Sequence, residues 1–170
     1  MNRSSRRHRT LDTRGQAVAE FALVLPLLLF LFLGMVEVGN ALTVAHTLSK
    51  LSREGANIAS RGTSLDTVLH VVASSGRDIQ LERRGGSVVS RIEVRPDGPM
   101  VLAQVASAGY ETRSRLGTVG ASPVSFASYG LERGSTHYVV EVFYRYEPIT
   151  PFARLFESAL PDPIYERAVF

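Results

Sequence analysis

The longest apolar stretch of the chain runs from Phe21 to Val36 without a charged residue, and a carboxylate stands at each end, Glu20 and Glu37. As a helix, this run spans roughly 24 Å at about 1.5 Å per residue, whereas a hydrocarbon core is ~30 Å thick. A spanning helix must therefore recruit neighbours on both sides, and we expect it over residues 16–45. One or both carboxylates are then expected near the hydrocarbon boundary.

Beyond the charge-free run, apolar positions recur at alternating spacings of four and three, which is the period of one helix face. This stripe consists of Val44, Leu48, Leu51, Gly55 and Ile58. Gly62 is a good C-terminal stop, so the pattern predicts one helix from about residue 16 to 61. Its second half is expected to pack on a folded domain, with Gly55 at a close approach to another backbone.

The rest of the chain shows the alternation that is typical of strands. A short helix is expected over 64–75, then strands over 88–95, 100–106, 138–146 and 164–170, with turns at Gly85-Gly86 and 96–99. The clearest strand places Tyr138, Val140, Val142, Tyr144 and Tyr146 on one face, which we expect to pack on the long helix. The pattern predicts an α+β fold, one long N-terminal helix on a small antiparallel sheet. A long surface loop over 110–133 and a short helix over 152–159 complete the prediction.

Positive charge is concentrated before the apolar run. The first fifteen residues carry five arginines and one acid, a net charge of +4, whereas the remainder holds 14 basic and 15 acidic residues. The pI near 9.6 therefore belongs to the leader and does not indicate nucleic-acid binding. By the positive-inside rule, the N-terminus lies in the cytoplasm and the C-terminal bulk lies across the membrane.

The sequence contains no recognisable catalytic or metal-binding constellation. There is no cysteine, no nucleophile elbow, no HExxH motif and no P-loop, and His8, His46, His70 and His137 are scattered. We therefore expect neither enzyme activity nor a metal or cofactor.

Two kinds of targeting signal also fit the N-terminus. Gly39-Asn40-Ala41 is a passable signal-peptidase site, and Ser5-Arg6-Arg7 lies where a twin-arginine signal would stand. Neither signal accounts for Glu20, because a signal peptide has no use for a carboxylate at the start of its apolar core.

The spacing of Gly15, Glu20 and Phe21 is more informative. Glu20 is the fifth residue after Gly15, an aromatic residue follows, and a long apolar helix begins there. This arrangement resembles the prepilin processing site of the type IV pilin superfamily, and its short Glu-Phe form is similar to the Flp/Tad branch. The segments 19–26 (AEFALVLP) and 52–59 (SREGANIA) further resemble the TadE-like pseudopilins of tight-adherence pilus assembly. The resemblance covers about residues 15–62.

The resemblance implies that a prepilin peptidase cuts between Gly15 and Gln16 on the cytoplasmic side. The products are a removed leader (1–15), a transmembrane helix (16–45) and a pilin-like periplasmic or extracellular domain (46–170), anchored once in the inner membrane. Its implied partners are the peptidase, other pilin-like subunits with their membrane platform, and lipid, without any cofactor or nucleic acid.

The cut creates an α-ammonium at Gln16, one helical turn from Glu20, so the two groups share a helix face. A carboxylate in a membrane normally finds a partner, here its own Gln16 or that of a neighbouring subunit. The alternative is that Glu20 extends into the cytoplasmic headgroups.

Pro26 either bends the helix for bundle packing or is a tolerated membrane proline. Glu37 is expected to mark the outer interface. A membrane-anchored envelope binding module and a secreted soluble protein remain as other readings.

Overall fold

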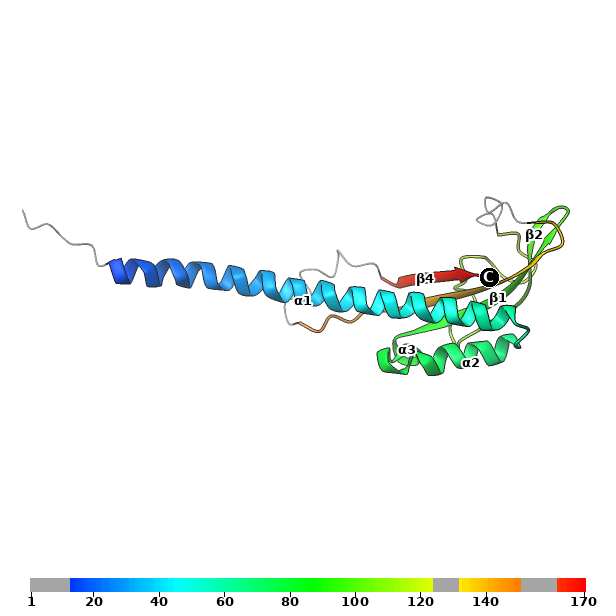
Figure 1. The fold of residues 1–170 in the computed structure, drawn as a ribbon, viewed down its shortest axis with the longest axis horizontal. Helices are drawn as coiled ribbons and strands as arrows, with labels where there is room; N and C mark the ends of the chain where they lie inside the picture. The colour runs from blue at the N-terminus through cyan, green and yellow to red at the C-terminus, as the bar shows by residue number, and fades with distance from the viewer. Residues whose placement is uncertain (1–12, 124–131, 151–161) are drawn as a thin grey trace, which may run out of the picture.

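The structure, a computed structural model, describes residues 13–123, 132–150 and 162–170 (Figure 1). The helical elements come first along the chain: α1 (Thr13–Ser60), α2 (Leu65–Ser75), the 3-10 turn η1 (Arg77–Ile79) and α3 (Leu81–Arg84). Four strands follow: β1 (Gly85–Arg95), β2 (Gly98–Ala106), β3 (Thr136–Tyr144) and β4 (Ile164–Val169). They form one antiparallel sheet in the order β2-β1-β3-β4. The predicted α+β class, a long N-terminal helix on a small antiparallel sheet, is confirmed.

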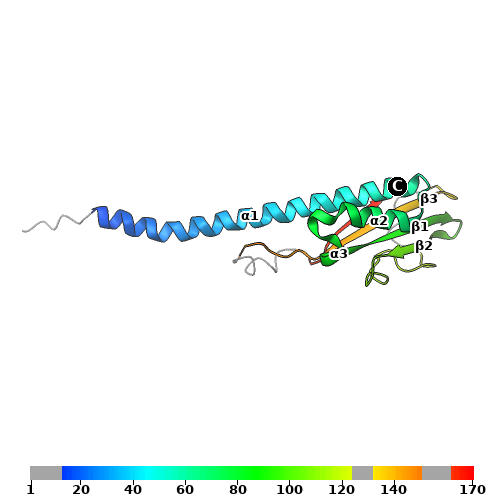
Figure 2. The ribbon, with the colours of Figure 1, turned by 90° about the horizontal axis from the view of Figure 1, so that it is seen from below.

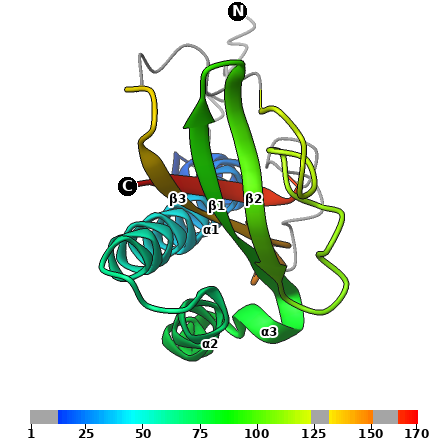
Figure 3. The ribbon, with the colours of Figure 1, turned by 90° about the vertical axis from the view of Figure 1, so that its right-hand side faces the viewer.

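The helix α1 is continuous through Pro26, and its first half stands clear of the domain (Figures 1 and 2). In the described part of the chain, it is the one helix that is long and apolar enough to cross a membrane. Its second half lies along the sheet, with α2 beside it on the same face (Figure 3). The side chain of Ser64 caps α2 by accepting from the Thr67 N–H, which fixes the turn after α1.

The main core lies between this helical layer and the sheet. Leu48 and Leu51 of α1 are buried there against α2 and β3, and Ile58 packs at its margin. A Cβ built on Gly55 would lie 2.7 Å from Val72 Cγ2 and 3.3 Å from Val140 Cγ2, so glycine allows the two helices and β3 to approach closely. These contacts explain the stripe of small and apolar residues on α1.

Strand β3 is interior, between β1 and β4. Val140, Val142 and Tyr144 face the helices from it and are buried, with Tyr138 and Tyr146 packed at the edges. This agrees with the face predicted for residues 138–146. The hairpin turn between β1 and β2 is formed by Pro96-Asp97, and Gly98 has a positive φ of 127°.

The prediction of a turn at Gly85-Gly86 is wrong, because both residues belong to β1 and pair with Tyr144 and Phe143 of β3. The absence of a side chain at these two positions instead allows β3 and the Tyr110 ring to lie close to the β1 backbone. A side chain at Gly85 would collide with the Phe143 carbonyl oxygen, and one at Gly86 with the ring of Tyr110. A glycine pair has the same appearance in a sequence whether it makes a turn or accommodates a ring.

The expectation of a long surface loop over 110–133 is confirmed in its described part, since residues 110–123 contain no helix or strand and are mostly exposed. Residues 107–123 fold over the second face of the sheet, where Leu116 is buried with Ile92, Val101 and Val139 in a smaller core. The sheet is therefore covered on both faces. Residues 124–131, and the helix predicted over 152–159, lie outside the described residues.

Candidate functional site

The uncovered part of α1 is the first element of the candidate site. Large apolar side chains from Val18 to Val36 point outward all round the helix and are mostly exposed. A helix that is apolar on every side is stable in lipid or among other helices but not in water. This half of α1 therefore needs a cover that the described chain does not itself supply.

At the beginning of this half, the predicted processing site lies open. A Cβ at Gly15 would contact nothing within 4 Å, and Phe21 is exposed on the apolar surface. The side-chain amide of Gln16 donates a hydrogen bond of 2.9 Å to Glu20 Oε1. Gln16 and Glu20 thus share one face of α1, as the spacing of four residues requires.

At the other end of the apolar half, Glu37 is almost fully buried, with 1% of its surface exposed. Its carboxylate accepts three hydrogen bonds from the segment after β3. The Tyr146 hydroxyl and the Ile149 N–H donate to Oε1 at 2.7 and 3.1 Å, and the Thr150 N–H donates to Oε2 at 3.0 Å. We call this contact the Glu37 clamp. The clamp holds the segment 146–150 against α1 at the end of its uncovered half.

Tyr146 is held from two sides in this clamp. Asn40 Nδ2 donates to the Tyr146 hydroxyl at 2.8 Å while that hydroxyl donates to Glu37. Burial, with the hydrogen bond to Glu37 as a second cause, raises the pKa of Tyr146 to about 12. Both effects favour the protonated phenol, which is the form that donates to the carboxylate.

Sequence reasoning treated Glu37 as a marker of the interface and missed the clamp. One signal was available: the buried stripe of α1 extends backwards from Val44 through Ala41 to Glu37, at the same spacings of three and four. A carboxylate at a stripe position predicts a buried acceptor that needs donors. The identity of those donors, more than 100 residues later in the chain, is not visible in the pattern.

A second buried carboxylate, Glu141 on β3, organises the opposite face of the sheet. It accepts from the Ser114 hydroxyl, from the Arg115 N–H at 2.9 Å and from the Tyr165 hydroxyl at 2.8 Å. The pKa of Tyr165 is raised by burial and by the negative charge of Glu141. The Arg115 guanidinium lies 3.8 Å from the centre of the Tyr165 ring. Glu141 therefore holds the loop onto the sheet, which is a structural task.

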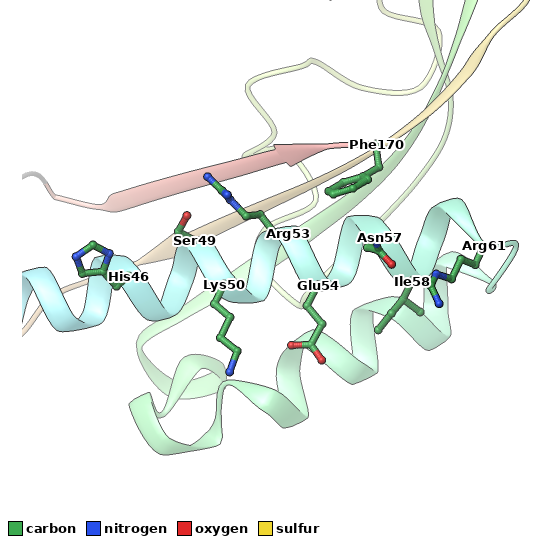
Figure 4. A pocket seen from close by; sticks show the side chains of 9 residues that line it. All are labelled: His46, Ser49, Lys50, Arg53, Glu54, Asn57, Ile58, Arg61 and Phe170. Carbon is green, nitrogen blue, oxygen red and sulfur yellow. The ribbon is translucent and has the colours of Figure 1, made fainter.

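The outer face of α1 carries an open groove of about 780 Å³ beside the sheet (Figure 4). Its charged lining is mainly basic, since Lys50, Arg53 and Arg61 are accompanied by the single acid Glu54. Figure 4 shows Arg53 directed toward β4, with Phe170 over the far end of the groove. This face is the part of the outer half of α1 that the described domain leaves accessible.

Within the described residues, no group of three or more histidine, cysteine, aspartate or glutamate side chains is placed to hold a metal ion. His137 bonds to the Ser135 hydroxyl at 2.8 Å, and His46 lines the groove. In the described part of the chain, neither histidine has both a nucleophile and an acid hydrogen-bonded to it.

Comparison with known proteins shows what the helix α1 is similar to. The family model of TadE-like protein matches residues 15–57, which confirms the resemblance read from segments 19–26 and 52–59 together with the spacing of Gly15, Glu20 and Phe21. The matched segment is most of α1 and does not extend into the sheet. No curated protein and no solved structure matches the chain. The match associates the chain with the pilus-related TadE-like proteins through its helix.

Proposed function

We propose that this protein is a structural, non-enzymatic pseudopilin of a Flp/Tad pilus. In this proposal a prepilin peptidase removes residues 1–15, and α1 anchors the mature chain once in the inner membrane with its domain on the outer side. The observation that carries the proposal is the combination of Gly15, Glu20 and Phe21 at the start of an uncovered apolar helix whose sequence is TadE-like. Its partners are the peptidase, other pilin-like subunits with their membrane platform, and lipid.

The geometry around Glu20 supports an assembly role. In the uncut chain the Gln16 side chain reaches Glu20, so the new α-ammonium of Gln16 arises one turn from the carboxylate. An α-amino group is largely protonated and positively charged in water at neutral pH. Pairing with Glu20 of the same or a neighbouring helix neutralises a carboxylate, which costs about 2.5–3.5 kcal/mol at the centre of the hydrocarbon and less near its boundary. Where the partner is the amine of a neighbouring helix, burial of Glu20 favours helix association.

The Glu37 clamp argues against the reading as a secreted protein. Cleavage after Ala41 would remove Glu37 and Asn40, and the Tyr146 hydroxyl and two backbone N–H groups would lose their partners. Hydrogen bonds to a charged group contribute about 1.5–3 kcal/mol each, so these contacts favour a domain that keeps its helix. The basic groove on the outer face of α1 is a surface on which a neighbouring subunit can lie.

The test combines processing and assembly. The N-terminal residue of the membrane-purified protein is expected to be Gln16, whereas Met1 would indicate an uncut anchor and Leu42 a secreted product. Gly15→Leu is expected to abolish cleavage. Glu20→Gln is expected to be cut and inserted normally but to lose piliation and cross-linking to other pilin-like subunits.

The matched control is Glu82→Gln, an exposed carboxylate on α3 that lies outside both the apolar half of α1 and the groove. It is expected to leave piliation unchanged. Normal piliation by Glu20→Gln in a strain without the wild-type copy would refute the assembly role and would favour a Glu20 that extends into the headgroups.

A further inference from the structure

The Glu37 clamp fixes where the domain begins along α1. Glu37 immediately follows the charge-free run that ends at Val36, and it is covered by the segment 146–150. From Gln16 to Val36 a helix is about 31 Å long, which matches a hydrocarbon core of ~30 Å. Residues 16–36 are therefore long enough to span the hydrocarbon, and the spanning segment can end at Val36, nine residues before its predicted end.

Ile149 lies at this same level. Its N–H donates to Glu37 at 3.1 Å, yet 61% of its surface is exposed. The orange end of the segment after β3 runs along α1 toward its uncovered half, away from the sheet (Figures 1 and 2). Around Glu37, α1 also exposes Met35, Val38 and Leu42. An isolated exposed isoleucine needs no explanation, but this one adjoins a helix whose apolar surface continues into the membrane.

We propose that this end of the domain is a membrane-contacting surface, in which Ile149, Val38 and Leu42 enter the outer boundary between headgroups and acyl chains of the lipid bilayer. The surface rests on the membrane insertion of α1 proposed above. Glu37 is its positioning residue, because its three donors hold Ile149 against the helix where the helix leaves the hydrocarbon. The same contacts satisfy a carboxylate that would otherwise face lipid.

Lipid is the occupant that fits this surface because it is continuous with the all-round apolar surface of α1. The membrane boundary then falls between Val36 and Glu37, and the domain rests directly on the outer leaflet. A stalk of bare helix between the membrane and the domain is excluded by this arrangement.

The chain contains no cysteine, so single cysteines can be introduced without background. The full-length protein is reconstituted into lipid vesicles with an environment-sensitive fluorophore at one of three sites. Ile149→Cys probes the surface, and Leu28→Cys probes the middle of the uncovered half. Val119→Cys is the matched control, because Val119 is 58% exposed and belongs to the loop on the far side of the sheet. Quenching by lipids with a spin label near the headgroup or deep in the acyl chain reports contact with lipid and its depth.

The expected result is quenching by the shallow label at position 149, quenching by the deep label at position 28, and none at position 119. Burial of position 149 against another protein would give a blue-shifted but unquenched signal and would overturn the proposal. Quenching at position 28 without quenching at 149 would overturn it too, while the membrane insertion of α1 would stand. Absence of quenching at position 28 would refute the insertion itself.

Glu37→Gln in the Ile149→Cys background tests the positioning role. Weakening of the clamp is expected to reduce shallow quenching at position 149 at least twofold and to leave quenching at position 28 unchanged. Glu54→Gln in the same background is expected to change neither. Unaltered quenching at position 149 in the Glu37→Gln protein would remove Glu37 from the proposal.

Discussion

Glu37→Gln replaces one carboxylate oxygen by an amide nitrogen and keeps the length and shape of the side chain. If the amide oxygen takes the place of Oε1, it can still accept from the Tyr146 hydroxyl and the Ile149 N–H. The amide NH2 group then faces the Thr150 N–H, which is a donor and loses its acceptor. In the reverse orientation the amide NH2 group would face the Ile149 N–H, and the Tyr146 hydroxyl would have to accept in place of donating, so the first orientation is expected.

The magnitude follows from these three bonds. A hydrogen bond to a charged group contributes about 1.5–3 kcal/mol, whereas one between neutral groups contributes about 0.5–1.5 kcal/mol. The variant loses one charged bond and weakens two, but water reaches the partly exposed Thr150 and offsets some of the loss. We expect the free energy of opening the segment 146–150 to fall by about 2–3 kcal/mol. At 1.4 kcal/mol per tenfold, amide exchange that follows the opening equilibrium becomes about 30- to 140-fold faster.

Amide hydrogen exchange in vesicles or detergent micelles measures this quantity at the Ile149 and Thr150 N–H groups. Exchange in β3 is expected to change far less, because the segment can open without the sheet. Glu54→Gln, an exposed carboxylate on the same helix, should leave both groups unchanged within about 0.5 kcal/mol. Exchange at Thr150 that is equally slow in wild type and Glu37→Gln would show that the clamp contributes nothing to holding the segment.

Two further predictions concern packing and pH. In denaturant titrations, Gly55→Ala is expected to lower the free energy of unfolding by about 1–2 kcal/mol, because overpacking against Val72 outweighs the gain in helix propensity. Gly39→Ala in the same helix is the control. A Cβ there meets nothing within 4 Å, so this variant should be neutral or stabilising. Since the pKa values of Tyr146 and Tyr165 are raised in the folded state, the stability they contribute is fully present below the unfolded value near ~10 and is lost as pH rises through the folded values. Unfolding midpoints should therefore fall between pH 10 and about 12, and Tyr165→Phe should reduce that fall; an equal fall in the variant would exclude Tyr165 as a source.

Features that depend on neighbours along the chain were predictable before the fold was known. The 3–4 spacing from Val44 to Ile58 predicted the packed half of α1, and alternation predicted β3 and its tyrosine face, because each needs only the period of one element. The spacing of Gly15, Glu20 and Phe21 identified the TadE-like helix in the same local way. The roles of these three residues in processing and assembly remain predictions.

Contacts between residues far apart in the chain became visible only in the folded structure. Glu37 acquires its donors from residues 109 to 113 positions later, and a carboxylate has the same letter whether it faces lipid, water or three donors. Glu141 lies in a strand that reads as ordinary alternation, yet it holds a loop 26 residues earlier. Gly85 and Gly86 read as a turn because the rule for glycine pairs is local, whereas their actual constraint is the approach of β3 and the Tyr110 ring. A buried polar group needs a hydrogen-bond partner, and a buried glycine can admit a neighbouring group. Which residues are buried is decided only when the chain packs.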